Sequence, residues 1–201
     1  EALGDPRLAD RALWALEEAG VDYDFKPVDI LRGEGQSEWF LRLNPFGKVP
    51  VLIDDQLVLS ESAAICEFVA ERYPRAGLMP PPATPERAQC YQWISFLISE
   101  VDAVLWNIAK HRFALPEERR VPAVIETATW EFGRAVRILE QALRDKSFLA
   151  ADQFSVADIL AGHCLLWARS ARVGFDSPVL DQYLARLTGR SAYIRATERA
   201  R

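Results

Sequence analysis

The stretch that decides the fold reads NPFGKVPVL over residues 44–52 and, after one hairpin, SESAAI over residues 60–65. Short apolar runs at residues 49–53 and 57–59 predict two strands joined by a tight turn. The apolar positions of residues 61–73 recur at helical spacing and predict an amphipathic helix. The segment is therefore a β-hairpin that leads directly into a helix.

The chain before this hairpin has a mixed helix and strand pattern. Residues 9–19 predict a helix that Gly20 ends, and residues 23–30 alternate like a half-buried strand. Residues 37–43 predict a short helix that ends ahead of Pro45, as helices commonly do before proline. These elements and the hairpin make up an α/β unit.

The chain after the hairpin helix changes character at Pro74. A proline-rich stretch forms a linker, and Thr84 followed by Pro85 has the pattern of a helix cap and first turn. Only helical patterns follow. We expect a first domain at residues 1–75, a linker at 76–85 and an all-helical domain at 86–201. Its helices are expected at residues 86–112, 118–145, 156–171, 180–187 and 191–199.

Charge and composition limit the kinds of partner. A formal net charge of −5 argues against nucleic acid or an anionic membrane, because both select basic patches. No apolar run approaches the roughly eighteen residues of a membrane span, and no signal peptide is visible. The 3 widely spaced cysteines and 2 isolated histidines predict neither a disulfide framework nor a metal site. We therefore expect a cytoplasmic protein with no metal, nucleic-acid or membrane partner.

Taken together and in this order, residues 44–52 and 60–65 resemble the NPxGxVPxL…ESxAI signature of the glutathione transferase superfamily. The resemblance covers nearly the whole chain, since ALEEAGVDYDF at residues 15–25 and the proline linker also fall where the family has them. It implies an α/β thioredoxin-like N-terminal domain followed by an all-α C-terminal helical domain. It also implies a homodimeric enzyme that joins the thiol of glutathione, its co-substrate, to an electrophilic small molecule.

The resemblance assigns glutathione-binding roles to two short segments. It implies a cis peptide bond before Pro50, which lets Val49 pair through its backbone with the cysteinyl part of glutathione. Ser62 begins a helix, where backbone N–H groups and the helix dipole attract the γ-glutamyl carboxylate. The resemblance also implies that Glu61 helps to bind the γ-glutamyl end of glutathione. The structural alternative is that Ser62 only caps its helix and that Val49 and Pro50 only begin a strand.

Four further residues take roles from the resemblance. Gln36 and Lys48 lie where the family recognises the glycyl carboxylate. In the family the electrophile pocket lies between the two domains, next to the first long helix of the second domain. Trp106 and Asn107 of that helix are therefore the expected pocket contacts.

The loop expected to activate the thiol departs from the family pattern. The family places a Tyr, Ser or Cys just after the first strand to stabilise the thiolate, but residues 3–11 contain none of these. Three explanations stay open: residues of this region are absent from the sequence, a backbone N–H or the cation Arg7 or Arg11 lowers the thiol pKa, or conjugating activity is lost. The rival functions are a glutathione-dependent disulfide reductase and a non-catalytic scaffold or interaction protein of the same fold.

A second motif, FSVADI at residues 154–159, is structural. Ser155 and Asp158 have the spacing of a capping box, in which each side chain bonds the backbone N–H of the other residue. Phe154 and Ile159 have the spacing of a hydrophobic staple. The motif predicts the start of a core helix in the second domain.

Overall fold

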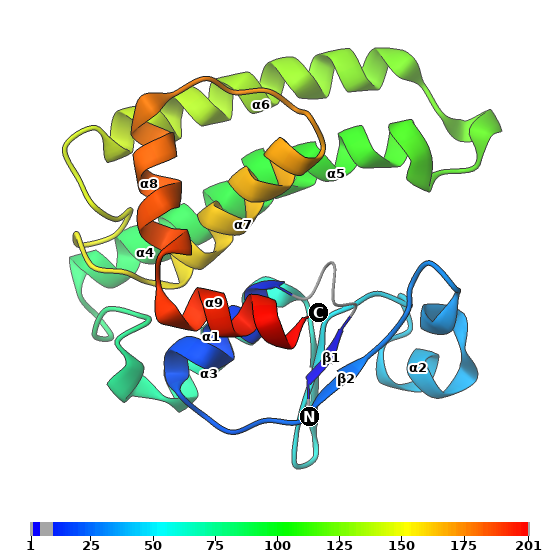
Figure 1. Ribbon diagram of the computed structural model, residues 1–201, viewed down its shortest axis with the longest axis horizontal. Coiled ribbons are helices and arrows are strands. Elements are labelled where there is room, and N and C mark those ends of the chain that lie inside the picture. The colour runs from blue at the N-terminus through cyan, green and yellow to red at the C-terminus, as the bar shows by residue number, and fades with distance from the viewer. Residues whose placement is uncertain (1, 5–9, 201) are drawn as a thin grey trace. The chain divides into compact units, whose positions relative to one another are not determined.

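The computed structural model describes residues 2–4 and 10–200, and Figure 1 shows its elements. They form two compact units. The sheet unit runs to Met79 and includes the chain again from Thr188, whereas the helical unit is Pro80–Leu187. The domain bounds expected from the sequence place residues 188–201 with the helices. The structure instead groups this segment with the sheet unit, because its helix packs against the first helix of the chain.

A four-stranded sheet organises the sheet unit, with strand order β2-β1-β3-β4. β1 is parallel to β2 and antiparallel to β3, and β3 is antiparallel to β4. The strands are β1 Ala2–Gly4, β2 Phe25–Pro27, β3 Val51–Asp54 and β4 Leu57–Ser60. The strand expected over residues 23–30 is shorter because Pro27 has no N–H to donate and the chain then turns, with Asp29 N donating to Glu34 Oε2 at 2.7 Å.

Helices cover both faces of this sheet. α1 (Asp10–Ala19) and α3 (Ser62–Arg72) lie on one side and α2 (Glu38–Leu43) on the other, as Figure 1 shows. Ile65 of α3 is fully buried, and α3 contacts both β3 and β4. Phe40 of α2 packs with Val28 and Val51 on the opposite side. The sheet unit therefore has a core on each face, which fixes the hairpin between them.

The helical unit contains helices and no strand within its described residues. Thr84 Oγ1 accepts the N–H of Arg87 at 3.2 Å, which confirms the expected cap. The expected helix from 118 begins instead at Pro122, because proline fits the first turn of a helix but not its interior. No described helix combines the length and the apolar character needed to cross a membrane. The helices are α4 Pro85–Phe96, α5 Ala103–Ala109, α6 Pro122–Leu143, α7 Val156–Ser170 and α8 Pro178–Thr188.

The sequence predicts one helix over residues 86–112. The chain is helical throughout this range, but two segments of it are π-helical rather than α-helical. α4 passes into a π-helical segment at Leu97–Asp102, and α5 passes into another at Lys110–Ala114. Each wider turn shifts the residues beyond it around the helix axis relative to a regular α-helix. Segments of this kind occur frequently at functional sites.

The capping box at the start of α7 is confirmed. The Ser155 side chain accepts the backbone N–H of Asp158, and Asp158 Oδ2 accepts the backbone N–H of Ser155 at 2.9 Å. Phe154 and Ile159 are both buried, and Phe154 packs edge to face on Phe148. The first turn of α7 is therefore held in place by its own sequence.

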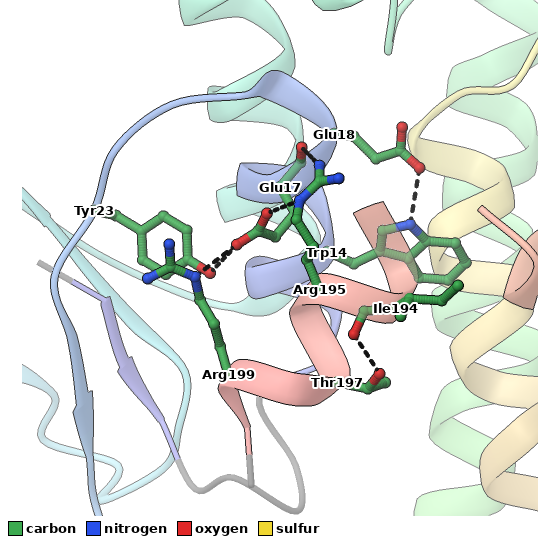
Figure 2. Close-up of polar contacts among 8 residues, drawn as sticks. All are labelled: Trp14, Glu17, Glu18, Tyr23, Ile194, Arg195, Thr197 and Arg199. Carbon is green, nitrogen blue, oxygen red and sulfur yellow. Dashed lines mark hydrogen bonds and ion pairs between the residues drawn. The ribbon is translucent and has the colours of Figure 1, made fainter. Parts of the chain in front are cut away.

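Ion pairs and hydrogen bonds connect the last helix, α9 (Ser191–Arg199), to α1. Figure 2 shows Glu17 of α1 within reach of Tyr23 and of two arginines from α9. Arg195 Nε lies 2.7 Å from Glu17 Oε2 and Arg199 Nε 2.9 Å from Glu17 Oε1, and the Tyr23 hydroxyl donates to Oε1 at 2.8 Å. A second anchor joins Glu18 to Arg190 through two parallel hydrogen bonds. These contacts hold the C-terminal helix in the sheet unit.

Replacing Glu17 by glutamine is expected to lower the free energy of unfolding by about 2 kcal/mol at neutral pH, because hydrogen bonds to charged groups contribute about 1.5–3 kcal/mol. Burial alone would raise the pKa of Glu17, but hydrogen bonds from Arg195 and Tyr23 and the charge of Arg199 lower it. The stabilisation is therefore present above the unfolded pKa of about 4.3 and is lost as the pH falls through the lower folded value.

Urea unfolding of both proteins at pH about 7 and about 3 measures this difference. Glu198→Gln, on the exposed side of α9, is the matched control and should leave stability unchanged. A difference between wild type and Glu17→Gln that persists undiminished at the lower pH would contradict the ion-pair explanation.

Candidate functional site

The hairpin brings the two expected glutathione-binding segments to one end of the sheet. β3 and β4 pair with Val51 opposite Ser60. Val49 and Pro50 come just before Val51, and Glu61 and Ser62 come just after Ser60, so both pairs lie at the same end of the hairpin. The Val49–Pro50 peptide bond is cis, as the resemblance implies.

Close backbone packing brings a third segment next to this end. Gly35 lies so near the carbonyl oxygen of Gly47 that a Cβ at position 35 would collide with it. A Cβ at Gly47 would likewise collide with the amide of Gln36. Asn44 shapes the same loop, because its Nδ2 donates to the carbonyl oxygen of Lys48 at 2.7 Å. Gln36 and Lys48 are both exposed beside these contacts.

Glu61 and Ser62 occupy an unusual helix start. Glu61 is the N-cap of α3 and has φ 70° and ψ 111°, a conformation that costs a non-glycine residue energy and that clusters at functional sites. The Glu61 side chain makes no capping hydrogen bond. Ser62 is the first residue of the helix, where backbone N–H groups lack partners within the helix. This end of α3 therefore presents donors and a positive dipole end, which suit a carboxylate.

Arg11 reaches Ser62 from α1. Its side chain is only 5% exposed, and its Nη1 donates to Ser62 Oγ at 3.2 Å. The carbonyl oxygen of Arg11 accepts the thiol of Cys66 at 3.4 Å. Burial raises the pKa of the Cys66 thiol to about 12, so this cysteine is not a nucleophile at neutral pH. The contact with Ser62 was not visible in the sequence, because the two residues are 51 positions apart.

For the other three expected site residues, Arg7, Trp106 and Asn107, the expected roles rest on the sequence alone. Arg7 lies within residues 5–9, outside the part of the chain that the structure describes. Trp106 and Asn107 lie on α5, where Trp106 is 38% exposed and Asn107 is half-buried. A role in binding the electrophile therefore stays a prediction for these two residues, as does a role in thiolate stabilisation for Arg7 and Arg11.

Comparison with known protein families matches both parts of the chain. The model of the glutathione S-transferase N-terminal domain matches residues 3–71, and that of the C-terminal domain matches residues 122–187. Glutathione S-transferase 3 of Zea mays is 32% identical over 158 residues, which is 78% of this chain and 70% of that protein. The chain belongs to the glutathione S-transferase family. Its fold is accordingly the expected one, a thioredoxin-like N-terminal domain with an all-helical C-terminal domain.

Two further relatives are informative, one because its structure contains glutathione and the other because its name states a reaction. The theta class glutathione S-transferase from Xanthomonas axonopodis pv. citri, solved with glutathione bound, superposes with a TM-score of 0.81. The two sequences are 30% identical, and the superposition covers 98% of this chain and 95% of that protein. The disulfide-bond oxidoreductase YfcG of Escherichia coli strain K12 is 30% identical over 162 residues, 77% of this chain and 72% of that protein.

Proposed function

We propose that the sheet unit binds glutathione and that the protein conjugates the glutathione thiol to an electrophilic small molecule. The main support for this proposal is the register of the hairpin. Because Val51 pairs with Ser60, the cis Val49–Pro50 bond and the N-terminus of α3 lie at the same end of the sheet. Val49 pairs with the cysteinyl backbone as an added strand would, and the N-terminus of α3 receives the γ-glutamyl carboxylate. Gln36 and Lys48 receive the glycyl carboxylate.

The Arg11 contact supports the placement of the γ-glutamyl end at Ser62. Because Ser62 Oγ accepts a hydrogen bond from Arg11, its own hydroxyl hydrogen is available to donate to a ligand carboxylate. The buried guanidinium adds a positive charge behind that hydroxyl. Ser62 and Arg11 thus act on the carboxylate together, one by a direct hydrogen bond and the other through its charge.

The reaction that follows is a displacement at an electrophilic carbon. The thiol loses its proton to solvent, the thiolate sulfur forms a bond to the carbon, and a leaving group such as a halide departs with the electron pair of the broken bond. The protein contributes orientation of the thiol and a lowered thiol pKa. Trp106 and Asn107 are the proposed contacts of the electrophile, and a backbone N–H or the cation Arg7 or Arg11 is the proposed stabiliser of the thiolate.

A second candidate function is glutathione-dependent reduction of disulfides. The similarity to the disulfide-bond oxidoreductase of Escherichia coli favours it. The same binding residues would serve, because glutathione is held in the same way whichever partner its thiolate attacks.

Rate measurements with glutathione and either an aryl halide or a mixed disulfide separate these functions. Conjugation of the aryl halide above the uncatalysed rate is the expected result. Turnover of the disulfide alone would favour the reductase. Turnover of neither substrate, by a protein that binds glutathione, would refute both enzymes and leave a non-catalytic binding protein.

Assembly and location are further proposals. We propose a homodimer in the cytoplasm, in which the sheet unit of one subunit packs on the helical unit of the other. Phe46, at the tip of the loop that precedes the cis bond, is 75% exposed and would be covered in such a dimer. The free cysteines Cys66, Cys90 and Cys164 fit a reducing compartment. A sedimentation experiment that finds only the mass of one chain would refute the dimer.

A further inference from the structure

Asp102, His163 and Cys164 meet inside the helical unit, whereas the residues proposed to bind glutathione belong to the sheet unit. Asp102 ends the first π-helical segment, and His163 and Cys164 are neighbours in the middle of α7. One possible ligand atom from each of the three lies within 4.8 Å of the other two. The Cys164 Sγ lies 3.8 Å from Asp102 Oδ1.

The distances fit a tetrahedral metal ion. Zinc binds thiolate sulfur at about 2.3 Å and carboxylate oxygen at about 2.0–2.2 Å, so two such ligands at the tetrahedral angle lie about 3.6 Å apart. The Cys164 and Asp102 atoms are already near that separation. Because no pair of the three is more than 4.8 Å apart, closing to tetrahedral separations needs a movement of at most about 1 Å, which small side-chain rotations provide.

The chemistry of the three groups also suits a transition metal. Thiolate, imidazole and carboxylate are the protein ligands of zinc, and sites with three such ligands keep a fourth position for water. Two of the three are anionic when bound, so together they balance the charge of a divalent ion. Cys164 is buried, whereas Asp102 and His163 are half-buried, so an ion can reach the cluster from the side of these two residues.

We propose that Asp102, His163 and Cys164 bind a divalent transition-metal ion, with Zn²⁺ as the ion that best fits the ligand set. On binding, the Cys164 thiol releases its proton to solvent and its sulfur bonds the metal. Water completes the coordination. The proposal is independent of glutathione, because all three ligands belong to the helical unit.

The competing explanation is that Cys164 merely donates a weak hydrogen bond to Asp102 in a packed interior. Co²⁺ distinguishes the two, because cobalt bound to a thiolate gives a charge-transfer absorption that cobalt in water does not. We would titrate Co²⁺ into reduced, chelator-treated protein that carries no histidine tag. The expected result is a saturable thiolate-to-cobalt band at one ion per chain. Zn²⁺ should then abolish the band by displacing Co²⁺, because zinc favours tetrahedral sites with thiolate and imidazole ligands.

Two variants and one control complete the test. Cys164→Ser should abolish the band, and Asp102→Asn, which keeps the side-chain shape, should weaken Co²⁺ binding at least about tenfold. Cys90→Ser, at another buried cysteine of the helical unit, should leave the band intact. Zn²⁺ should raise the melting temperature of the wild type and not that of Asp102→Asn. No band in the wild type, or a band that survives Cys164→Ser, would overturn the proposal.

Discussion

Replacing Asp158 by alanine is expected to destabilise the protein by about 4 kcal/mol, enough to abolish folding of a marginally stable domain near its working temperature. Asp158 is 0% exposed, and its carboxylate accepts from Leu149 N at 3.0 Å, Ser155 N at 2.9 Å, Ser155 Oγ at 3.1 Å and Tyr183 Oη at 2.7 Å. Alanine leaves these donors without their acceptor, and each buried donor so left costs about 1–3 kcal/mol. Urea unfolding followed by circular dichroism measures the loss.

Asp158 therefore does more than cap α7. Its bonds to Leu149 and Tyr183 tie the start of the helix to the loop before it and to α8. Asp176→Ala, at an exposed aspartate of the same unit, is the control and should change stability by less than about 0.5 kcal/mol. A loss for Asp158→Ala no larger than that of an ordinary cap, about 1 kcal/mol, would contradict a role for Asp158 beyond capping.

The same residue predicts a dependence on pH. Burial raises the pKa of Asp158 to about 6, although hydrogen bonds from Tyr183, Leu149 and Ser155 oppose the shift. The folded state therefore binds this proton more tightly than the unfolded state, whose pKa is about 3.9. The stability that the proton adds is complete below about pH 4 and is lost as the pH rises through about 6. The wild type should accordingly lose stability relative to Asp158→Asn over that interval.

Replacing Ser62 by alanine is expected to weaken glutathione binding about tenfold to a hundredfold. The change removes the hydroxyl proposed to donate to the γ-glutamyl carboxylate, and a hydrogen bond to a charged group contributes about 1.5–3 kcal/mol. It also leaves the buried Arg11 guanidinium without its 3.2 Å contact to Ser62 Oγ. Calorimetric titration of each folded variant with glutathione measures the change in affinity.

Ser60→Ala is the matched control for this substitution, because Ser60 ends β4 two residues earlier and has no proposed contact with the ligand. It should bind glutathione like the wild type. Melting curves of both variants establish that each is folded at the temperature of the titration. Undiminished affinity in Ser62→Ala would place the γ-glutamyl carboxylate elsewhere.

Features set by neighbouring residues could be predicted from the sequence. The capping box at Ser155 and Asp158 depends on a spacing of three residues, and the Thr84 cap depends on the same local rule. The β3–β4 hairpin follows from two short apolar runs, and the helix after it follows from apolar positions at helical spacing. These elements come from contacts whose partners are visible within one window of sequence.

Features that join distant segments could not be predicted in this way. The hydrogen bond from Arg11 to Ser62 spans 51 positions, and the ion pair of Glu17 with Arg195 of α9 spans 178. No local pattern indicates that the final helix belongs with the sheet unit rather than with the preceding helices. The cluster of Asp102 with Cys164 spans 62 positions and also depends on a π-helical segment that periodicity does not reveal.

The central claim is that the end of the sheet formed by Val49, Pro50, Glu61 and Ser62 is a glutathione site. Calorimetric titration of the wild-type protein with glutathione, with the thiolate absorbance followed in parallel, tests it most directly. The account predicts saturable binding of one glutathione per chain and a bound thiol whose pKa is lower than that of free glutathione. No binding at millimolar glutathione would contradict it.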